Sequence, residues 1–191
     1  MATKTDSSTI DRNSALAFGA VAAAGAVAGF AANFVRKAVV QAPTYLAGSW
    51  DEALATEHKM TLAIFDTLEK TTEQQTAKRG FLLMQLKHAL AKHAMQEENA
   101  VYAALRDAGD RETADKLNGD HGYVKQYLYD LDMMPRSDPA WLPKAREFRA
   151  LIERHAGEEE REVFPALKAK LTEEQNKALT AVMNKEGLKI A

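Results

Sequence analysis

Apolar residues recur at intervals of three and four along most of the chain, the spacing that places them on one face of a helix. Four long stretches follow this pattern, separated by turn residues or prolines: 49–71, 76–108, 110–134 and 138–170. A shorter one over 172–185 ends before Gly187. The alternation typical of strands is scarce. The pattern predicts an all-α fold, with an up-down-up-down four-helix bundle over 49–170 and a short C-terminal helix within 171–191.

Capping residues and helix breakers support these boundaries. Ser49 and Glu52 form the spacing of a capping box at the start of the first bundle helix. Gly109 fits the end of the second helix, and Asp110 fits the cap of the third. Pro165 is expected to kink or break the fourth helix, because proline lacks a backbone N–H.

The region before the bundle has a different character. Residues 1–14 are polar and predict a flexible tail. The run from Ala15 to Val35 contains no charged residue and is followed directly by Arg36 and Lys37. It predicts an additional apolar Ala/Gly-rich helix over 15–37. Its length meets the requirement of about 20 residues for a bilayer-spanning helix.

Three interpretations of this apolar helix stay open. As a membrane anchor, it would place the following basic residues and the bundle on the cytoplasmic side, tethered to the inner face of the cytoplasmic membrane. As an assembly helix, its Gly25 and Gly29 would let two copies approach closely in a homo-oligomer. A targeting segment is the third. The following residues 38–48, which include Pro43 and Gly48, predict a linker.

Composition excludes several classes of function. The chain of 191 residues fits one domain with an appendage. Its formal net charge of −2 gives no basic face for nucleic acid. It contains no cysteine, which excludes disulfides, thiolate metal sites and cysteine nucleophiles and is consistent with the cytoplasm.

One motif occurs twice. The chain reads HAMQEENAVYAAL from His93 and HAGEEEREVFPAL from His155, and seven of the thirteen positions are identical. Each copy places a glutamate, Glu97 or Glu159, four residues after its histidine, so that both side chains share one helix face. A further histidine precedes each copy at a similar distance. His58 lies 35 residues before the first copy, and the other copy is preceded in the same way by a histidine 34 residues away, at position 121.

Burying these groups together would be costly without a cation. The inner faces of the four helices would carry six polar side chains at one level: His58, His93, Glu97, His121, His155 and Glu159. Unpaired buried charges cost several kcal/mol each. Two divalent ions could share the four imidazoles as terminal ligands and the two carboxylates as bridges. Imidazole and carboxylate together suit iron, manganese or zinc. A polar core without metal is the alternative.

Three neighbouring side chains are not placed among the ligands. Glu98 and Glu160 are expected to face solvent or to lie behind the metal ligands. His88 lies about 140° around the helix from His93, so it is expected at the surface or behind the ligands.

The order of these residues resembles the hemerythrin-like, or HHE cation-binding, domain family over roughly 49–170. The resemblance implies a non-haem centre of two Fe ions, bridged by carboxylates and an oxo or hydroxo species, with Mn or Zn as alternatives. Members of the family bind O₂, sense oxygen, redox state or iron, decompose peroxide, or handle nitric oxide and iron.

The chain departs from the oxygen-carrying hemerythrins. These have a fifth histidine one turn after the third-helix histidine, where this chain has Lys125. They also space the last histidine and carboxylate by five, which would make Glu160 the counterpart. Tyr123, Tyr127 and Tyr129 lie near in sequence and are expected either to pack or to supply an alternative ligand.

We therefore expect a protein that binds or senses a small ligand, O₂, NO or peroxide, at a centre of four histidines and two glutamates. An enzyme, either a di-iron oxidase or a peroxidase, is the first alternative, and an iron-handling protein is another. A membrane-bound or self-assembling structural protein that carries the bundle as cargo is the last.

Overall fold

The computed structural model describes residues 32–33 and 35–191, and every regular element within them is helical. The long helices are α2 (Trp50–Glu69), α3 (Thr76–Gln96), α5 (Arg111–Met133), α6 (Trp141–Glu158) and α8 (Glu173–Ile190). Two π-helical segments of five residues, η1 (Glu97–Val101) and η2 (Glu159–Val163), continue α3 and α6 into the short helices α4 (Tyr102–Asp107) and α7 (Phe164–Lys170).

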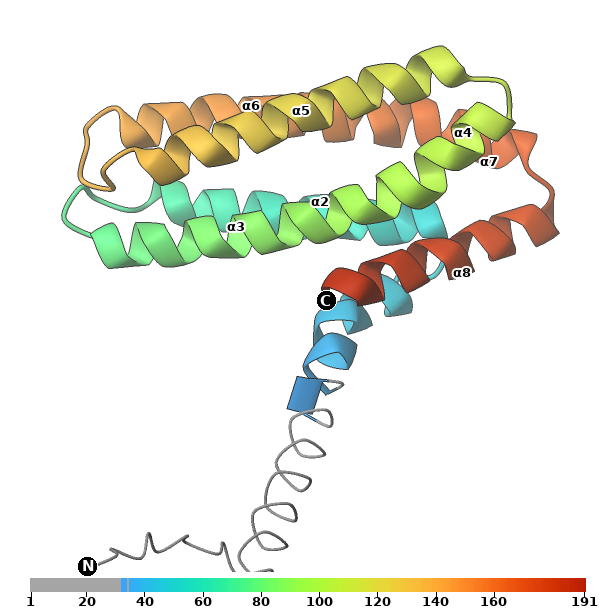
Figure 1. Cartoon of the computed structure of the whole chain (residues 1–191), viewed down its shortest axis with the longest axis horizontal. Coiled ribbons are helices and arrows are strands. Elements are labelled where there is room, and N and C mark those ends of the chain that lie inside the picture. Colours follow the sequence, from blue (N-terminus) through green and yellow to red (C-terminus); the bar gives the residue numbers. More distant parts are fainter. Residues whose placement is uncertain (1–31, 34) are drawn as a thin grey trace, which may run out of the picture.

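The helices form two antiparallel hairpins that pack against each other. Figure 1 shows α2 with α3 and α4 as one hairpin, and α5 with α6 and α7 as the other. Successive helices run in opposite directions, and α8 crosses the first hairpin at the end where α4 and α7 lie (Figure 1). The prediction of an all-α, up-down-up-down four-helix bundle is confirmed.

Local sequence explains where the helices start and stop. Ser49 and Glu52 form the capping box of α2, and Asp110 accepts a hydrogen bond from the backbone N–H of Thr113 at the start of α5. Gly109 adopts φ +87°, a left-handed conformation that ends α4 and that glycine adopts without steric cost. These boundaries agree with the capping and breaking residues of the sequence.

The two π-helical segments were not expected. In each, the backbone hydrogen bonds span five residues, so the turn is wider than an α-turn. Pro165 lies in the first turn of α7, just after η2, and the helix continues past it, so the predicted break does not occur. Proline is not the cause of the wide turn, because the first copy of the motif has Ala103 at the matched position and forms the same π turn.

Two hydrophobic cores lie on either side of the polar motif. The first gathers the start of α2 and α5 with the ends of the two motif helices, and includes Trp50, Leu117, Tyr102 and Phe164. The second fills the opposite half of the bundle and includes Phe65, Leu86, Trp141 and Phe148. Along each helix the motif histidine falls between the two cores, so the polar residues meet at one level of the bundle.

The segment over 35–46 is helical and packs against α8 (Figure 1). Gln41 is buried and donates a hydrogen bond to the side-chain oxygen of Asn184 over 3.0 Å. The prediction of a linker over 38–48 is therefore wrong for residues 38–46.

Tertiary contacts explain this helix in spite of Pro43, whose missing N–H weakens a helix interior. Arg36 donates to the backbone carbonyl of Ala191 over 2.9 Å, and Lys37 donates to a carbonyl of the same helix end. Cations are favourable at a helix C-terminus, where backbone carbonyls lack partners. These contacts between distant parts of the chain are not visible in a local sequence pattern.

The C-terminal helix is longer than predicted because Gly187 is a packing residue and not a stop. An added Cβ at Gly187 would lie 2.8 Å from Gln41 Oε1 and 2.9 Å from the amide of Gln96. The glycine therefore allows α8, α3 and the segment over 35–46 to approach one another.

Among the described residues, no helix is both long and apolar enough to cross a membrane. The predicted tail over 1–14 and nearly all of the apolar run from Ala15 to Val35 lie outside the described residues. The anchor and the assembly helix stay predictions.

Candidate metal centre

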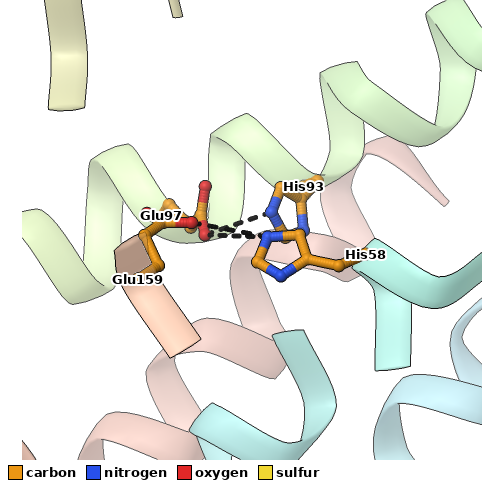
Figure 2. Close-up of side chains that lie close together, drawn as sticks. All are labelled: His58, His93, Glu97 and Glu159. Atoms are coloured by element: carbon orange, nitrogen blue, oxygen red, sulfur yellow. Dashed lines mark ion pairs between the residues drawn. The ribbon is translucent and has the colours of Figure 1, made fainter. Parts of the chain in front are cut away.

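The six residues of the repeated motif meet inside the bundle. His58 comes from α2, His93 from α3, His121 from α5 and His155 from α6, and each imidazole is buried. Glu97 and Glu159 begin η1 and η2 and are completely buried. Figure 2 shows both carboxylates pointing toward the imidazoles of His58 and His93.

One group of ligand atoms forms around the first hairpin. His93 Nε2 lies 3.1 Å from Glu97 Oε1, and His58 Nε2 lies 3.4 Å from Glu159 Oε2 (Figure 2). Each of these four residues offers one ligand atom, and the four atoms lie within 4.8 Å of one another. That is close enough for a single cation to contact all of them.

A second group forms around the other hairpin. His121 Nε2 lies 3.2 Å from Glu97 Oε2, and Glu97, His121 and His155 offer ligand atoms within 4.8 Å of one another. His155 Nε2 also lies 3.4 Å from Glu159 Oε2. Both carboxylates therefore lie between the two pairs of histidines, where a carboxylate can bridge two cations.

Many inward-facing atoms have no hydrogen-bond partner. Within the described residues, these include the Nε2 atoms of His58, His93 and His155, with Glu97 Oε1 and Glu159 Oε2. A buried polar atom without a partner costs about 1–3 kcal/mol. Cations in the two ligand groups would accept lone pairs from these atoms. The residues present thus fit a metal, and the mixed nitrogen and oxygen set suits iron, manganese or zinc.

The outward-facing nitrogens of His58 and His121 contact carboxylates of the opposite hairpin in a nearly symmetric way. His58 Nδ1 lies 2.9 Å from Glu160 Oε1, and His121 Nδ1 lies 2.9 Å from Glu98 Oε1. A carboxylate in this place fixes the tautomer and the orientation of an imidazole ligand. The expectation that Glu98 and Glu160 lie at the surface or behind the ligands agrees with this position.

Two further carboxylates were missed by sequence reasoning. Glu57 Oε2 lies 3.0 Å from His93 Nδ1, and Asp120 Oδ2 lies 3.5 Å from His155 Nδ1. The sequence did contain a clue, since an acidic residue directly precedes both His58 and His121. Each such pair points its histidine to the centre and its acid to the neighbouring helix of the same hairpin.

Charges within the cluster shift the pKa values of its members. Burial lowers the pKa of His93, but the charge of Glu97 and the hydrogen bond with Glu57 outweigh it, and the pKa lies well above its ordinary value. Burial raises the pKa of Glu97, but the charge of His93 and the hydrogen bond with His121 hold it well below the usual range. The raised pKa values of His58, His93 and His121 favour their protonated forms when no cation is present, so metal binding is expected to displace protons.

A comparison with models of protein families identifies the family to which this arrangement belongs. The model of the hemerythrin HHE cation binding domain matches residues 51–167. The chain belongs to the hemerythrin HHE family. The match includes both hairpins and all six residues of the repeated motif.

Two relatives support this assignment. The chain is 27% identical over 129 residues to an uncharacterised hemerythrin-like protein of Schizosaccharomyces pombe; the match covers 65% of this chain and 62% of that protein, less than two thirds of its length. The crystal structure of a hemerythrin HHE cation binding domain-containing protein from Mycobacterium kansasii, an Rv2633c homologue, superposes with a TM-score of 0.61 at 25% identity. That superposition covers 73% of this chain and 87% of the other.

This hemerythrin HHE domain also brings a tyrosine into its centre. Tyr102 is fully buried, and its hydroxyl donates to Glu159 Oε1 over 2.7 Å and lies 3.3 Å from His121 Nε2. Burial and the charges of Glu97 and Glu159 raise its pKa well above the ordinary value, so the phenol keeps its proton. The symmetric position on the other hairpin is Phe164, which stacks on His58 and has no hydroxyl.

Sequence reasoning missed Tyr102 because it assumed regular α-helices. Residues five apart lie about 140° apart on an α-helix, so Tyr102 was not expected on the face of Glu97. The wide turn of η1 brings them together, and Tyr102 Oη lies 3.3 Å from Glu97 Oε2.

The other side chains considered in the sequence lie elsewhere. Tyr123 and Tyr129 are exposed, and Tyr127 stacks on Phe148. Lys125 is exposed, with its Nζ 3.4 Å from Glu98 Oε1. His88 lines a groove of the hemerythrin HHE domain between the segment over 35–46, α2 and α3, outside the ligand groups.

A small cavity opens on one side of the cluster. Its volume is about 110 Å³, and all four motif histidines line it. The rest of its wall is mostly apolar, with Leu90, Val124 and Ile152 among the lining residues and Lys125 at its edge. A space of this size holds a molecule of a few atoms.

Proposed function

We propose that the chain is a non-haem di-iron protein that binds a small ligand, O₂, NO or peroxide, at a centre of four histidines and two glutamates. His58 and His93 would hold one ion, and His121 and His155 would hold the other. Glu97 and Glu159 would bridge them. The family assignment and the two groups of inward-facing ligand atoms support this proposal. Iron held by imidazole and carboxylate with open positions supplies dioxygen and peroxide chemistry.

The proposed choice of ligand is based on the apolar cavity beside the histidines. Its volume of about 110 Å³ is far below the roughly 300–1,000 Å³ of a drug-sized ligand pocket. Its mostly apolar wall favours uncharged molecules, because ions would lose their hydration without a partner. A diatomic gas or a peroxide meets both conditions.

The protein side chains hold the centre in shape for this ligand. Glu160 and Glu98 fix His58 and His121 through their Nδ1 atoms, so that Nε2 of each ring faces inward. The two carboxylates are completely buried between the two flanking cores, so they lie away from bulk water. The hydroxyl oxygen of Tyr102 lies 2.7 Å from Glu159 Oε1 and donates its proton to it, within the same centre.

That proton favours one second candidate, an oxidase or peroxidase at the same site. Tyr102 does not line the cavity, but a neutral phenol that donates to Glu159 within the centre can supply a proton to the reacting site. Steady-state consumption of hydrogen peroxide separates the two functions, with Glu159→Ala as the control variant. Turnover that depends on Glu159 would make the protein an enzyme, while ligand binding without turnover supports the binding function.

Metal analysis of the purified protein is the first experiment. We expect two irons per chain, a large loss of metal in His93→Ala and in His155→Ala, and no loss in His88→Ala. The histidine at position 88 is the matched control because it lies on the same helix as His93 but outside the ligand groups. Equal loss in all three variants, or one zinc per chain, would contradict the proposed centre.

A further inference from the structure

The near-symmetry of the two hairpins is broken behind one histidine. Glu57, the partner of His93, has a side chain that is 8% exposed and a hydrogen-bond distance of 3.0 Å. Asp120, the matching partner of His155, is 26% exposed and lies 3.5 Å away. The two metal positions share the same ligand types, so this difference lies in the groups that hold the ligands.

Three other groups fix Glu57. Lys92 Nζ donates to Glu57 Oε1 over 2.7 Å and to Thr44 Oγ1 over 2.8 Å. The hydroxyl of Thr44 in turn donates to Glu57 Oε1 over 2.5 Å. The amide nitrogen of Gln96 lies 2.9 Å from Glu57 Oε2 in the orientation that gives both of its polar atoms a partner.

Nothing comparable surrounds Asp120 in the part of the chain that the structure describes. Lys92 directly precedes His93, and the residue at the matched position before His155 is Arg154, which is exposed. Thr44 has no counterpart, because the segment over 35–46 packs only beside the first hairpin and α8 (Figure 1).

We propose that Thr44 and Lys92 are positioning residues that hold Glu57, and through it His93, so that the metal position at His58 and His93 keeps its ion longer than the other. The proposal rests on the proposed two-metal centre. A histidine whose ring is already fixed loses less conformational freedom when it binds a metal. Because Thr44 belongs to the segment over 35–46, retention of this ion depends on that segment staying packed against the bundle.

The test is the release of iron from the loaded full-length protein to an excess of a ferrous chelator. Wild-type protein should lose its two ions in a fast and a slow phase. Thr44→Val and Lys92→Met should accelerate the slow phase by up to about 10–100-fold, which is the loss of affinity usual when the partner of a metal ligand, here Glu57, is itself removed. Thr44→Ser, which keeps the hydroxyl, should release iron as wild type does. Arg154→Met, the matched exposed position, should leave both phases unchanged.

Loss of stability alone would move both phases together, whereas loss of positioning moves only the slow one. Thr44→Val removes a single hydroxyl, so it decides the matter even if Lys92→Met does not fold. A single release phase in wild type, or unchanged release in Thr44→Val, would overturn the proposal while leaving a two-metal centre intact. Wild-type protein that takes up no metal would overturn the proposed function as well.

Discussion

Each motif histidine uses its two ring nitrogens for different purposes. Nε2 faces the two buried glutamates, and Nδ1 faces an acidic side chain outside the cluster. The hydrogen bond to the outer carboxylate determines which ring nitrogen carries the proton and which is free for a cation. The orientation of the inner ligands therefore also depends on four outer carboxylates, which are Glu57, Glu98, Asp120 and Glu160.

Tyr102 offers a prediction at this scale. Its hydroxyl is the hydrogen-bond donor to Glu159 Oε1. Tyr102→Phe should destabilise the metal-free protein by about 1–3 kcal/mol, because it leaves a buried carboxylate oxygen without a partner. Urea denaturation followed by circular dichroism measures the effect, which should shrink when metal is bound.

Tyr127→Phe is the matched control. Tyr127 is half-buried and stacks on Phe148 with an interplanar angle of 6°, so its ring packing survives the loss of the hydroxyl. An equal loss of stability in both variants would show that the hydroxyl of Tyr102 makes no special contribution to the centre.

Single residues differ in how well their roles in the centre can be predicted from the sequence. The six motif residues were expected to meet because their spacing repeats within helices. Glu57 and Asp120 were not identified, because their role depends on contacts with the neighbouring helix. Tyr102 was not identified because its position depends on a π turn. That all six motif residues bind metal stays a prediction.

At the scale of whole elements, the helices of the bundle follow from local patterns, and the exceptions depend on long-range packing. The bundle helices start and stop close to their caps and glycines. The helix over 35–46 and the full length of α8 depend on each other, since they meet at Gly187. Local sequence rules predict that Pro43 and Gly187 end a helix. Tertiary contacts keep both residues within helices.

Two glycines in helices should respond to alanine in opposite ways. Gly187→Ala should destabilise the protein by about 1–3 kcal/mol, the usual cost of overpacking, because its Cβ would lie under 3 Å from the buried side chains of Gln41 and Gln96. Gly122→Ala should stabilise it by up to about 1 kcal/mol, since nothing lies within 4 Å of the added Cβ and alanine favours a helix.

Thermal unfolding of the metal-free protein compares the two variants under the same conditions. A stabilised Gly187→Ala would mean that α8 does not pack closely against α3 and the segment over 35–46. In that case the close approach described above would not contribute to stability in solution.

At the scale of the whole molecule, the level of the bundle that holds the polar motif residues separates two hydrophobic cores. In the metal-free protein, protonation of three of its imidazoles is expected to stabilise this level. The pKa values of His58, His93 and His121 all lie above the ordinary value, because the hydrogen bonds and charges of the neighbouring glutamates outweigh burial. These groups stabilise the folded state only while they are protonated.

The metal-free protein should therefore lose stability as the pH rises. A histidine with a raised folded pKa contributes fully below its unfolded pKa of about 6.5, and the contribution disappears as the pH passes the folded pKa. We expect the Tm to fall from about pH 6.5 upward. The metal-loaded protein should not follow this trend, because metal binds neutral imidazoles and gains affinity as protons leave.

Thermal scans between pH 6 and 9, with and without added iron, measure both trends. A metal-free Tm that rises over this range would contradict the protonation proposed for the cluster. The lower limit of the range keeps Glu57, whose pKa is lowered to about 2, ionised throughout.

The π turns have a consequence for the length of the chain. A π turn inside an α-helix holds one residue more than the α-turn it replaces. If the same residues formed a regular α-helix instead, all of α4 would be rotated by about 100° relative to α3, and the aromatic ring of Tyr102 would leave the interior. Deleting one residue between 98 and 101 should therefore restore a regular helix and keep the orientation of α4, so the register of the first core depends on the wide turn only while the extra residue is present.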